Sequence, residues 1–131
     1  MALSDLLKHW KSDSSTGPNI VTWRVQASRR AALMEFPADL PACFVDGLRQ
    51  KGIDALYSHQ AMAWEYARQG ENVVLATGTS SGKTLAYNLP VLSAIFEEPQ
   101  SRALYLFPTK ALTQDQRSGL SGLLELIPGL K

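Results

Sequence analysis

The residues best suited to chemistry lie in the run TGTSSGKT, residues 77–84. The run ends in Gly82, Lys83 and Thr84, so a flexible backbone is followed by a cation and a hydroxyl. These groups surround the phosphates and the Mg²⁺ of a nucleotide in the pattern G-x-x-x-x-G-K-[ST]. Thr77 stands where that pattern has its first glycine. The spacing alone therefore leaves two interpretations open, a phosphate-binding loop or a turn of small residues.

The elements on either side of the run favour phosphate binding. Residues 72–77 (NVVLAT) predict a short strand buried on both faces, and residues 83–96 predict a helix despite Pro90. Free N–H groups and the positive dipole end of a helix attract an anion at such a turn. We expect Lys83 to reach the β- and γ-phosphates and the Thr84 hydroxyl to bind Mg²⁺, which makes these two the predicted catalytic residues. The other residues expected around the phosphates are Thr77, Gly78, Thr79, Ser80, Ser81 and Gly82.

Gln60 lies upstream of the loop, near the start of a helix predicted over residues 59–69 with Ser58 as its N-cap and Gly70 at its end. A side-chain amide offers both a donor and an acceptor, which the edge of adenine also presents. By itself, a glutamine at such a position is more often only solvated. An earlier helix through Gln50, terminated by Gly52, is expected to have Asp39 as its cap.

A second strand, residues 103–107 (ALYLF), leads into PTKALTQDQ. Thr109 can cap a helix over residues 110–127, and N–H groups at that helix start suit a phosphate of a nucleic-acid backbone, with Lys110 adding charge. From spacing alone, an ordinary helix start with a surface lysine is the plainer interpretation.

The three motifs together resemble those of superfamily 2 helicases of the DEAD/DEAH-box type. ATGTSSGKTLAYNLPVL resembles motif I, LYSHQ is similar to the Q motif, and PTKAL matches motif Ia. The chain looks most like the branch of DNA helicases that includes the bacterial mitomycin-repair helicase and its fungal relatives of RecQ-like type. Ser80 replaces a glycine of common DEAD-box loops. The order and spacing of the motifs match over roughly residues 35–117.

This resemblance implies ATP and Mg²⁺ as cofactors. It also implies that Gln60 recognises adenine, with Tyr57 as a stacking surface. The single-strand backbone is expected to contact Pro108, Thr109 and Lys110, with Asp115, Gln116 and Arg117 as secondary candidates.

The expected fold class is α/β, the first half of a RecA-like P-loop NTPase domain with a parallel sheet and flanking helices. No D-E-x-H-like acidic motif occurs in the sequence, so the domain is expected to be incomplete. Residues 1–34 are interpreted as an N-terminal extension. Residues 35–131 are interpreted as the N-terminal part of a helicase ATP-binding domain, truncated before the Walker B motif.

Composition excludes several other classes. The chain has 131 residues and a net charge of +1, which excludes a strongly basic protein that coats nucleic acid. One cysteine cannot form an internal disulfide, and no apolar run approaches the about 20 residues that cross a bilayer. We expect an intracellular, cytoplasmic setting, or a nuclear one in a eukaryote.

The function expected from the resemblance is that of an ATP-dependent DNA helicase, moving 3′ to 5′ and associated with DNA repair. Its partner would be single-stranded or forked DNA, with RNA as an alternative, and no membrane. The 131 residues alone are expected to bind ATP at most weakly and not to unwind. Two other classes stay open: a different P-loop enzyme, such as a kinase or transport ATPase, and a non-catalytic nucleotide- or nucleic-acid-binding remnant.

Overall fold

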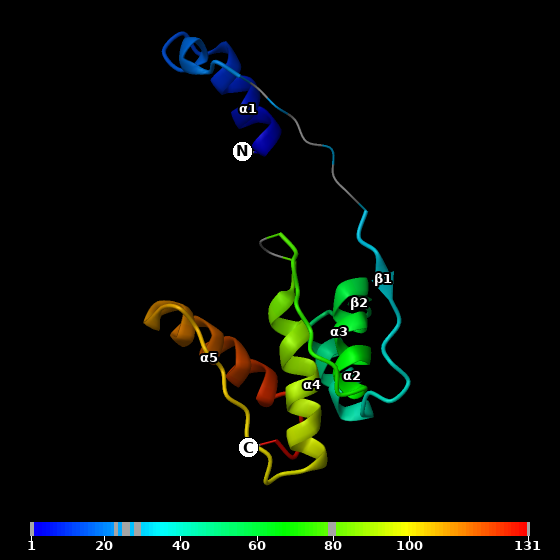
Figure 1. Cartoon of the computed structure of the whole chain (residues 1–131). Helices are drawn as coiled ribbons and strands as arrows, with labels where there is room; N and C mark the ends of the chain where they lie inside the picture. The colour runs from blue at the N-terminus through cyan, green and yellow to red at the C-terminus, as the bar shows by residue number, and fades with distance from the viewer. Residues whose placement is uncertain (1, 23, 25–26, 28–29, 79–80, 131) are drawn as a thin grey trace. The chain divides into compact units, whose positions relative to one another are not determined.

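The computed structural model describes residues 2–22, 24, 27, 30–78 and 81–130. The chain divides into two compact units, Met1–Arg30 and Ala31–Lys131, which are drawn in Figure 1. Two predicted phosphate-loop residues, Thr79 and Ser80, lie outside the described residues. Of the helices that the structure describes, none has the length and apolar character needed to cross a membrane.

The first unit contains one α-helix and a short 3₁₀ turn. Helix α1 spans Leu3–Ser12, and η1 spans Gly17–Asn19. Asp13 organises the chain between them, because its carboxylate accepts hydrogen bonds from the hydroxyl of Ser15 and from the backbone N–H of Thr16. Hydrogen bonds that favour the charged form, the one from Ser15 first, lower the pKa of Asp13 to about 2.

Within its described residues, the second unit is built around four helices and one very short antiparallel pair of strands. Its core contains apolar side chains from the segment before α2 and from every one of these helices. Figure 1 shows α3 and α4 side by side, which brings the helix of Gln60 against the helix that follows the candidate loop. The elements are β1 (Leu33–Met34), α2 (Ala42–Gln50), β2 (Leu56–Tyr57), α3 (Ser58–Arg68), α4 (Lys83–Glu97) and α5 (Lys110–Leu124).

The helices that flank the two motifs confirm the sequence prediction. Helix α4 continues through Pro90 to Glu97. At the start of α5, the backbone N–H of Leu112 donates to the hydroxyl of Thr109 at 3.2 Å, which is the expected cap. Helix α5 ends at Leu124, somewhat earlier than predicted. Gly52 and Gly70 have φ values of 75° and 78° just beyond α2 and α3, as helix-ending glycines do.

Two predicted caps are wrong, and for Asp39 the reason is a tertiary contact that engages its side chain elsewhere. Asp39 does not cap α2, which begins after Pro41. Its carboxylate accepts from the indole N–H of Trp64 at 2.9 Å and pairs with Arg68 at 3.2 Å. Ser58 is the first residue of α3 rather than its N-cap, a position that Tyr57 occupies.

The two predicted buried strands are not formed within the described residues. Residues 72–78 and 101–107 make no strand ladder, and Val74 and Leu106 are 92% and 82% exposed. A strand exists only where a neighbour satisfies its backbone groups, and no described segment does so here. The strands that do form are two residues long and antiparallel, pairing Leu33 with Tyr57 and Met34 with Leu56.

An ion pair joins the ends of α3 and α4. One guanidinium nitrogen of Arg68 donates to both carboxylate oxygens of Glu97, at 2.8 and 2.9 Å. The hydrogen bond from Arg68 lowers the pKa of Glu97 below its ordinary range. Any stability from this pair is therefore present above the ordinary pKa of a glutamate and is lost as the pH falls through the lowered value.

The exposure of residues 101–107 can be tested with a matched pair of leucines. Leu48→Ala removes a side chain that is 1% exposed and should lower the free energy of unfolding by about 2–5 kcal/mol. Leu106→Ala should change it by less than about 0.5 kcal/mol, because its side chain contacts mainly solvent. Urea unfolding of the chain followed by circular dichroism measures both values. Comparable losses for the two variants would mean that residues 103–107 are buried after all.

Candidate nucleotide-binding site

The turn into α4 depends on a glycine at position 82. Gly82 has φ 75° and ψ 24°, the left-handed conformation that other residues adopt only at a cost. A Cβ atom at this position would lie 2.5 Å from the amide nitrogen of Gln60, so a side chain would collide there. The missing Cβ therefore allows the backbone to approach α3 closely, and it keeps the loop side of the helix start free of bulk.

The ammonium group of Lys83 lies against the loop that precedes it. It donates to the carbonyl oxygens of Thr77, at 3.0 Å, and of Gly78. It also reaches the hydroxyls of Thr77 and Ser81, each at 3.3 Å, and these two hydroxyls hydrogen-bond to one another at 2.7 Å. Among the described residues, Lys83 forms no ion pair. A cation held only by neutral oxygens in a loop of small residues is suited to an anionic ligand.

The side-chain amide of Gln60 connects α3 to this loop. It is 4% exposed, and its oxygen accepts from the backbone N–H of Tyr57 at 2.8 Å while its nitrogen donates to the carbonyl of Gly82 at 2.9 Å. An amide has two N–H groups and two lone pairs. One donor and one acceptor therefore remain, already oriented by the two bonds that the amide makes.

A cavity of about 460 Å³ lies beside Gln60 and Gly82. Tyr57, Gln60 and Gly82 line it together with apolar side chains that include Ile53 and Leu85. The ring of Tyr57 is 40% exposed and stacks on His59, with centroids 5.6 Å apart. A partly exposed aromatic ring beside a fixed amide and an apolar wall has the character of a site for a flat, polar-edged ring.

The predicted metal ligand, Thr84, faces a different neighbour from Lys83. Its hydroxyl donates to the side-chain oxygen of Gln116 at 3.1 Å, and the hydroxyl of Tyr87 donates to the same oxygen at 2.5 Å. A hydroxyl that donates its proton keeps its lone pairs, so this contact is compatible with metal binding by Thr84. The hydroxyl of Thr84 is an oxygen donor, which is the type of ligand that Mg²⁺ prefers.

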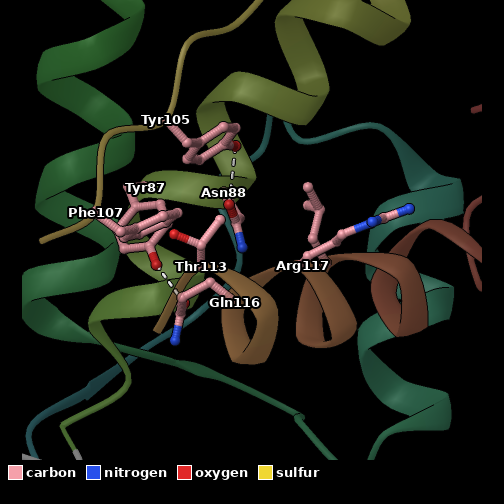
Figure 2. A pocket seen from close by; sticks show the side chains of 8 residues that line it. Tyr87, Asn88, Tyr105, Phe107, Thr113, Gln116 and Arg117 are labelled. Atoms are coloured by element: carbon pink, nitrogen blue, oxygen red, sulfur yellow. Dashed lines mark hydrogen bonds between the residues drawn. The ribbon is translucent and has the colours of Figure 1, made fainter. Parts of the chain in front are cut away.

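A second cavity, of about 230 Å³, lies between α4, α5 and the segment before α5. Figure 2 shows Tyr87, Tyr105 and Phe107 gathered on one side of it, with Thr113 and Gln116 reaching in from α5. The hydroxyl of Tyr105 donates to the buried side-chain oxygen of Asn88 at 2.9 Å, and burial raises the pKa of Tyr105. Asn88 thus fixes the exposed chain of residues 101–107 to α4.

The predicted nucleic-acid contact is exposed at the start of α5. Pro108, Thr109 and Lys110 all face solvent, and no hydrogen bond or ion pair among the described residues joins them to the candidate phosphate loop. Gln116, expected as a secondary nucleic-acid contact, is instead turned toward α4. A sequence signal for this existed: Gln116 precedes the buried Leu123 and Ile127 by 7 and 11 residues, so it continues the apolar stripe of α5.

Comparison with known sequences identifies the family. The sequence model of the DEAD/DEAH box helicases matches residues 57–130, which include the segments similar to motifs I and Ia and all of LYSHQ except Leu56. The ATP-dependent helicase YprA of Bacillus subtilis is 45% identical over 114 residues, covering 87% of this chain and 15% of YprA. The ATP-dependent helicase HRQ1 of Saccharomyces cerevisiae is 49% identical over 75 residues, covering 57% of this chain and 7% of HRQ1. The chain thus spans a small part of the length of these relatives.

Comparison with solved structures agrees with the sequence match. The DUF1998 helicase MrfA, crystallised with DNA and AMPPNP, superposes with a TM-score of 0.83 at 41% identity, covering 97% of this chain and 17% of MrfA. MrfA bound to DNA alone gives a TM-score of 0.82 over 98% of this chain and 18% of MrfA. These matches, together with the loop geometry, show that the chain has a RecA-like helicase fold and belongs to the DEAD/DEAH box helicase family.

Proposed function

We propose that this chain is the nucleotide-binding part of an ATP-dependent DNA helicase, which couples ATP hydrolysis to movement along single-stranded DNA from 3′ to 5′. The observation that carries the proposal is the joint arrangement of Gly82, Lys83 and Gln60. A glycine turn at a helix start and a buried, oriented amide line one cavity, and the residue after the glycine is a lysine that has no carboxylate partner among the described residues. MrfA, to which the chain is similar, has been crystallised with both AMPPNP and DNA.

In this proposal, different residues in and around the loop bind different parts of the nucleotide. Lys83 exchanges its carbonyl partners at Thr77 and Gly78 for phosphate oxygens, since a charged acceptor forms stronger hydrogen bonds than a neutral one. The remaining N–H and lone pair of Gln60 meet the edge of adenine, and Tyr57 lies beside the ring. Thr79 and Ser80, which lie outside the described residues, belong to the same proposed loop, as does Ser81.

Thr84 supplies the oxygen for the metal. Its hydroxyl lies on the first turn of α4, next to Lys83, where a bound phosphate would lie on the positive end of the helix dipole. Mg²⁺, when bound, would neutralise phosphate charge and orient the γ-phosphate for hydrolysis. The acidic residues that hydrolysis also needs are proposed to follow in the part of the helicase beyond these motifs.

The proposed contact with DNA is the start of α5. Pro108, Thr109 and Lys110 are exposed there, and the N–H groups at a helix start can bind backbone phosphate without reading sequence. Because this contact is to the backbone, it does not itself distinguish DNA from RNA. The choice of DNA rests on the similarity to MrfA, whose structures contain DNA.

The finer fold proposed for the intact domain is a parallel sheet with helices on both faces. In it, residues 72–77 and 103–107 pair with one another or with further strands, which would cover the exposed Val74 and Leu106. Residues 1–34 would precede this domain as an extension. Residues 35–131 would form the part of the domain that ends before its Walker B strand.

Replacing the loop lysine tests the nucleotide site. Lys83→Ala removes the only charged group of the loop among its described residues, so binding of Mg·ATP to the chain should weaken about 10- to 100-fold, the loss expected for a charge-assisted hydrogen bond. In the full-length helicase the same change should abolish ATP hydrolysis. Titration calorimetry and a phosphate-release assay measure the two effects.

Lys51→Ala is the matched control, because Lys51 is an exposed lysine just beyond α2 that makes no hydrogen bond to the described residues of the loop and is not among the residues that line the cavity. It should leave ATP binding unchanged. Wild-type ATP hydrolysis by the full-length Lys83→Ala variant would rule out the proposed site.

Replacing the exposed lysine of α5 tests the DNA contact. Lys110→Ala should weaken binding of single-stranded DNA by the full-length helicase for all sequences alike, and should lower the slope of log K against log salt by about 1. ATP binding in the absence of DNA should stay at its wild-type level. Fluorescence anisotropy of a labelled oligonucleotide at several salt concentrations provides the measurement, and an unchanged slope would remove Lys110 from the contact.

Replacing the glycine at the helix start tests the close approach of Gln60. Gly82→Ala introduces a Cβ at positive φ that also collides with the Gln60 amide, whereas Gly70→Ala introduces one at φ 78° with no atom within 4 Å. Gly70→Ala should cost about 1–2 kcal/mol in unfolding free energy, from backbone strain alone. Gly82→Ala should cost more, and the excess should shrink when Gln60→Ala is added. An equal cost for the two glycines would mean that Gln60 does not pack against the loop.

A further inference from the structure

The side-chain oxygen of Gln116 receives two hydrogen bonds from the helix that begins at the candidate phosphate loop. The hydroxyls of Thr84 and Tyr87, one turn apart on α4, donate to this one oxygen at 3.1 and 2.5 Å. Figure 2 shows the contact between Gln116 and Tyr87 across the gap between α4 and α5. The amide nitrogen of Gln116 donates to the carboxylate of Asp115 at 3.2 Å. With donors on one side and an acceptor on the other, the orientation of the amide is fixed.

Gln116 also marks the point at which α5 joins the rest of the unit. Every residue from 108 to 115 is exposed, and Gln116 is the first residue of α5 that is not. Farther along, Leu123 and Ile127 are buried in the core. The exposed start of α5, which includes Thr109 and Lys110, is thus connected to α4 through the Gln116 side chain.

The hydrogen bond decides where the lone pairs of Thr84 point. A threonine hydroxyl has one proton and two lone pairs, and it rotates freely unless a partner holds the proton. When the hydroxyl proton of Thr84 points at the side-chain oxygen of Gln116, the lone pairs of the hydroxyl are directed away from Gln116. Magnesium tolerates little deviation from octahedral geometry, with ligands at about 2.0–2.1 Å, so a preset hydroxyl favours its binding.

We propose that Gln116 is a positioning residue for the metal of the nucleotide site, acting by holding the hydroxyl proton of Thr84. This inference rests on the proposed function, because it assumes that Mg·ATP binds at Lys83 and Thr84. It assigns Gln116 to the nucleotide site rather than to the nucleic-acid contact. It also makes α5 a direct physical connection between the nucleotide site and the nucleic-acid contact. The helix that starts at Thr109 and Lys110 carries the residue that orients Thr84.

The test compares binding of ATP with Mg²⁺ in excess and ATP with EDTA, measured by titration of the chain. Gln116→Met keeps the length of the side chain and removes its acceptor, so it should weaken binding of Mg·ATP about 3- to 10-fold. Binding of metal-free ATP should not change, because Gln116 contacts no predicted phosphate ligand other than Thr84. Gln116→Glu retains an acceptor oxygen and should return the Mg·ATP affinity to within about twofold of the wild type.

The matched control is Gln114→Met, which changes the same residue type two positions earlier on the exposed part of α5. It should leave both affinities unchanged. Tyr87→Phe provides an independent variant should Gln116→Met not fold: it removes one hydroxyl donor to the same oxygen and should lower the Mg·ATP affinity about twofold or more, again without affecting metal-free ATP.

Each remaining result overturns the inference. Equal weakening of both forms of ATP by Gln116→Met would make Gln116 a structural residue only, and no weakening of either form would remove it from the site. Absence of binding of either form to the full-length wild-type helicase would overturn the proposed function, and the inference with it. A wild-type chain that binds both forms while the variants behave like wild type would overturn the inference alone.

Discussion

The hydrogen bond between the buried amide of Gln60 and the carbonyl of Gly82 fixes the candidate loop to the rest of the unit. Its 2.9 Å length is possible only because position 82 lacks a Cβ and adopts a positive φ. Gln60 is almost fully buried, so loss of this partner would leave a polar group unsatisfied, at a cost of about 1–3 kcal/mol. The loop is exposed, but its end at Gly82 is therefore held in place by the buried amide of Gln60.

The helices around the site depend on one another more than on any sheet. Gln60 joins α3 to the start of α4, and the Arg68–Glu97 ion pair joins the same two helices at the other end. Phe44, Leu48 and Trp64 complete the core between α2, α3 and α4. Helix α5 contributes Leu123 to that core, while its first two turns extend into solvent. The frame that holds the loop can thus form while residues 72–78 and 101–107 remain unpaired.

Sequence reasoning succeeded where the cause of a structure is local. Thr109 caps α5, and Gly70 ends α3, because a cap or a left-handed glycine needs only its own neighbours in the chain. It failed where distant residues compete for a side chain: Asp39 could have capped α2, but Trp64 and Arg68 take its carboxylate.

The strands and the role of Gln116 illustrate the same limit. The composition of residues 72–77 is that of a strand, but a ladder requires a neighbour that no local pattern supplies. The apolar stripe of α5 indicates that Gln116 faces the core, but only the position of α4 makes it an acceptor for Thr84. The roles predicted for the loop lysine, for Gln60 and for the start of α5 are compatible with where the structure places them, and they remain predictions.

The contacts of Lys83 have a kinetic consequence. The carbonyl oxygens of Thr77 and Gly78 compete with any incoming phosphate for the same ammonium group. Arrival and departure of a ligand can then proceed by exchange of one oxygen for another, so the cation never loses all its partners along the way. A loop of this kind gives up some affinity, because each phosphate contact replaces an existing one. In return, the same exchange would lower the barrier to release of a bound phosphate.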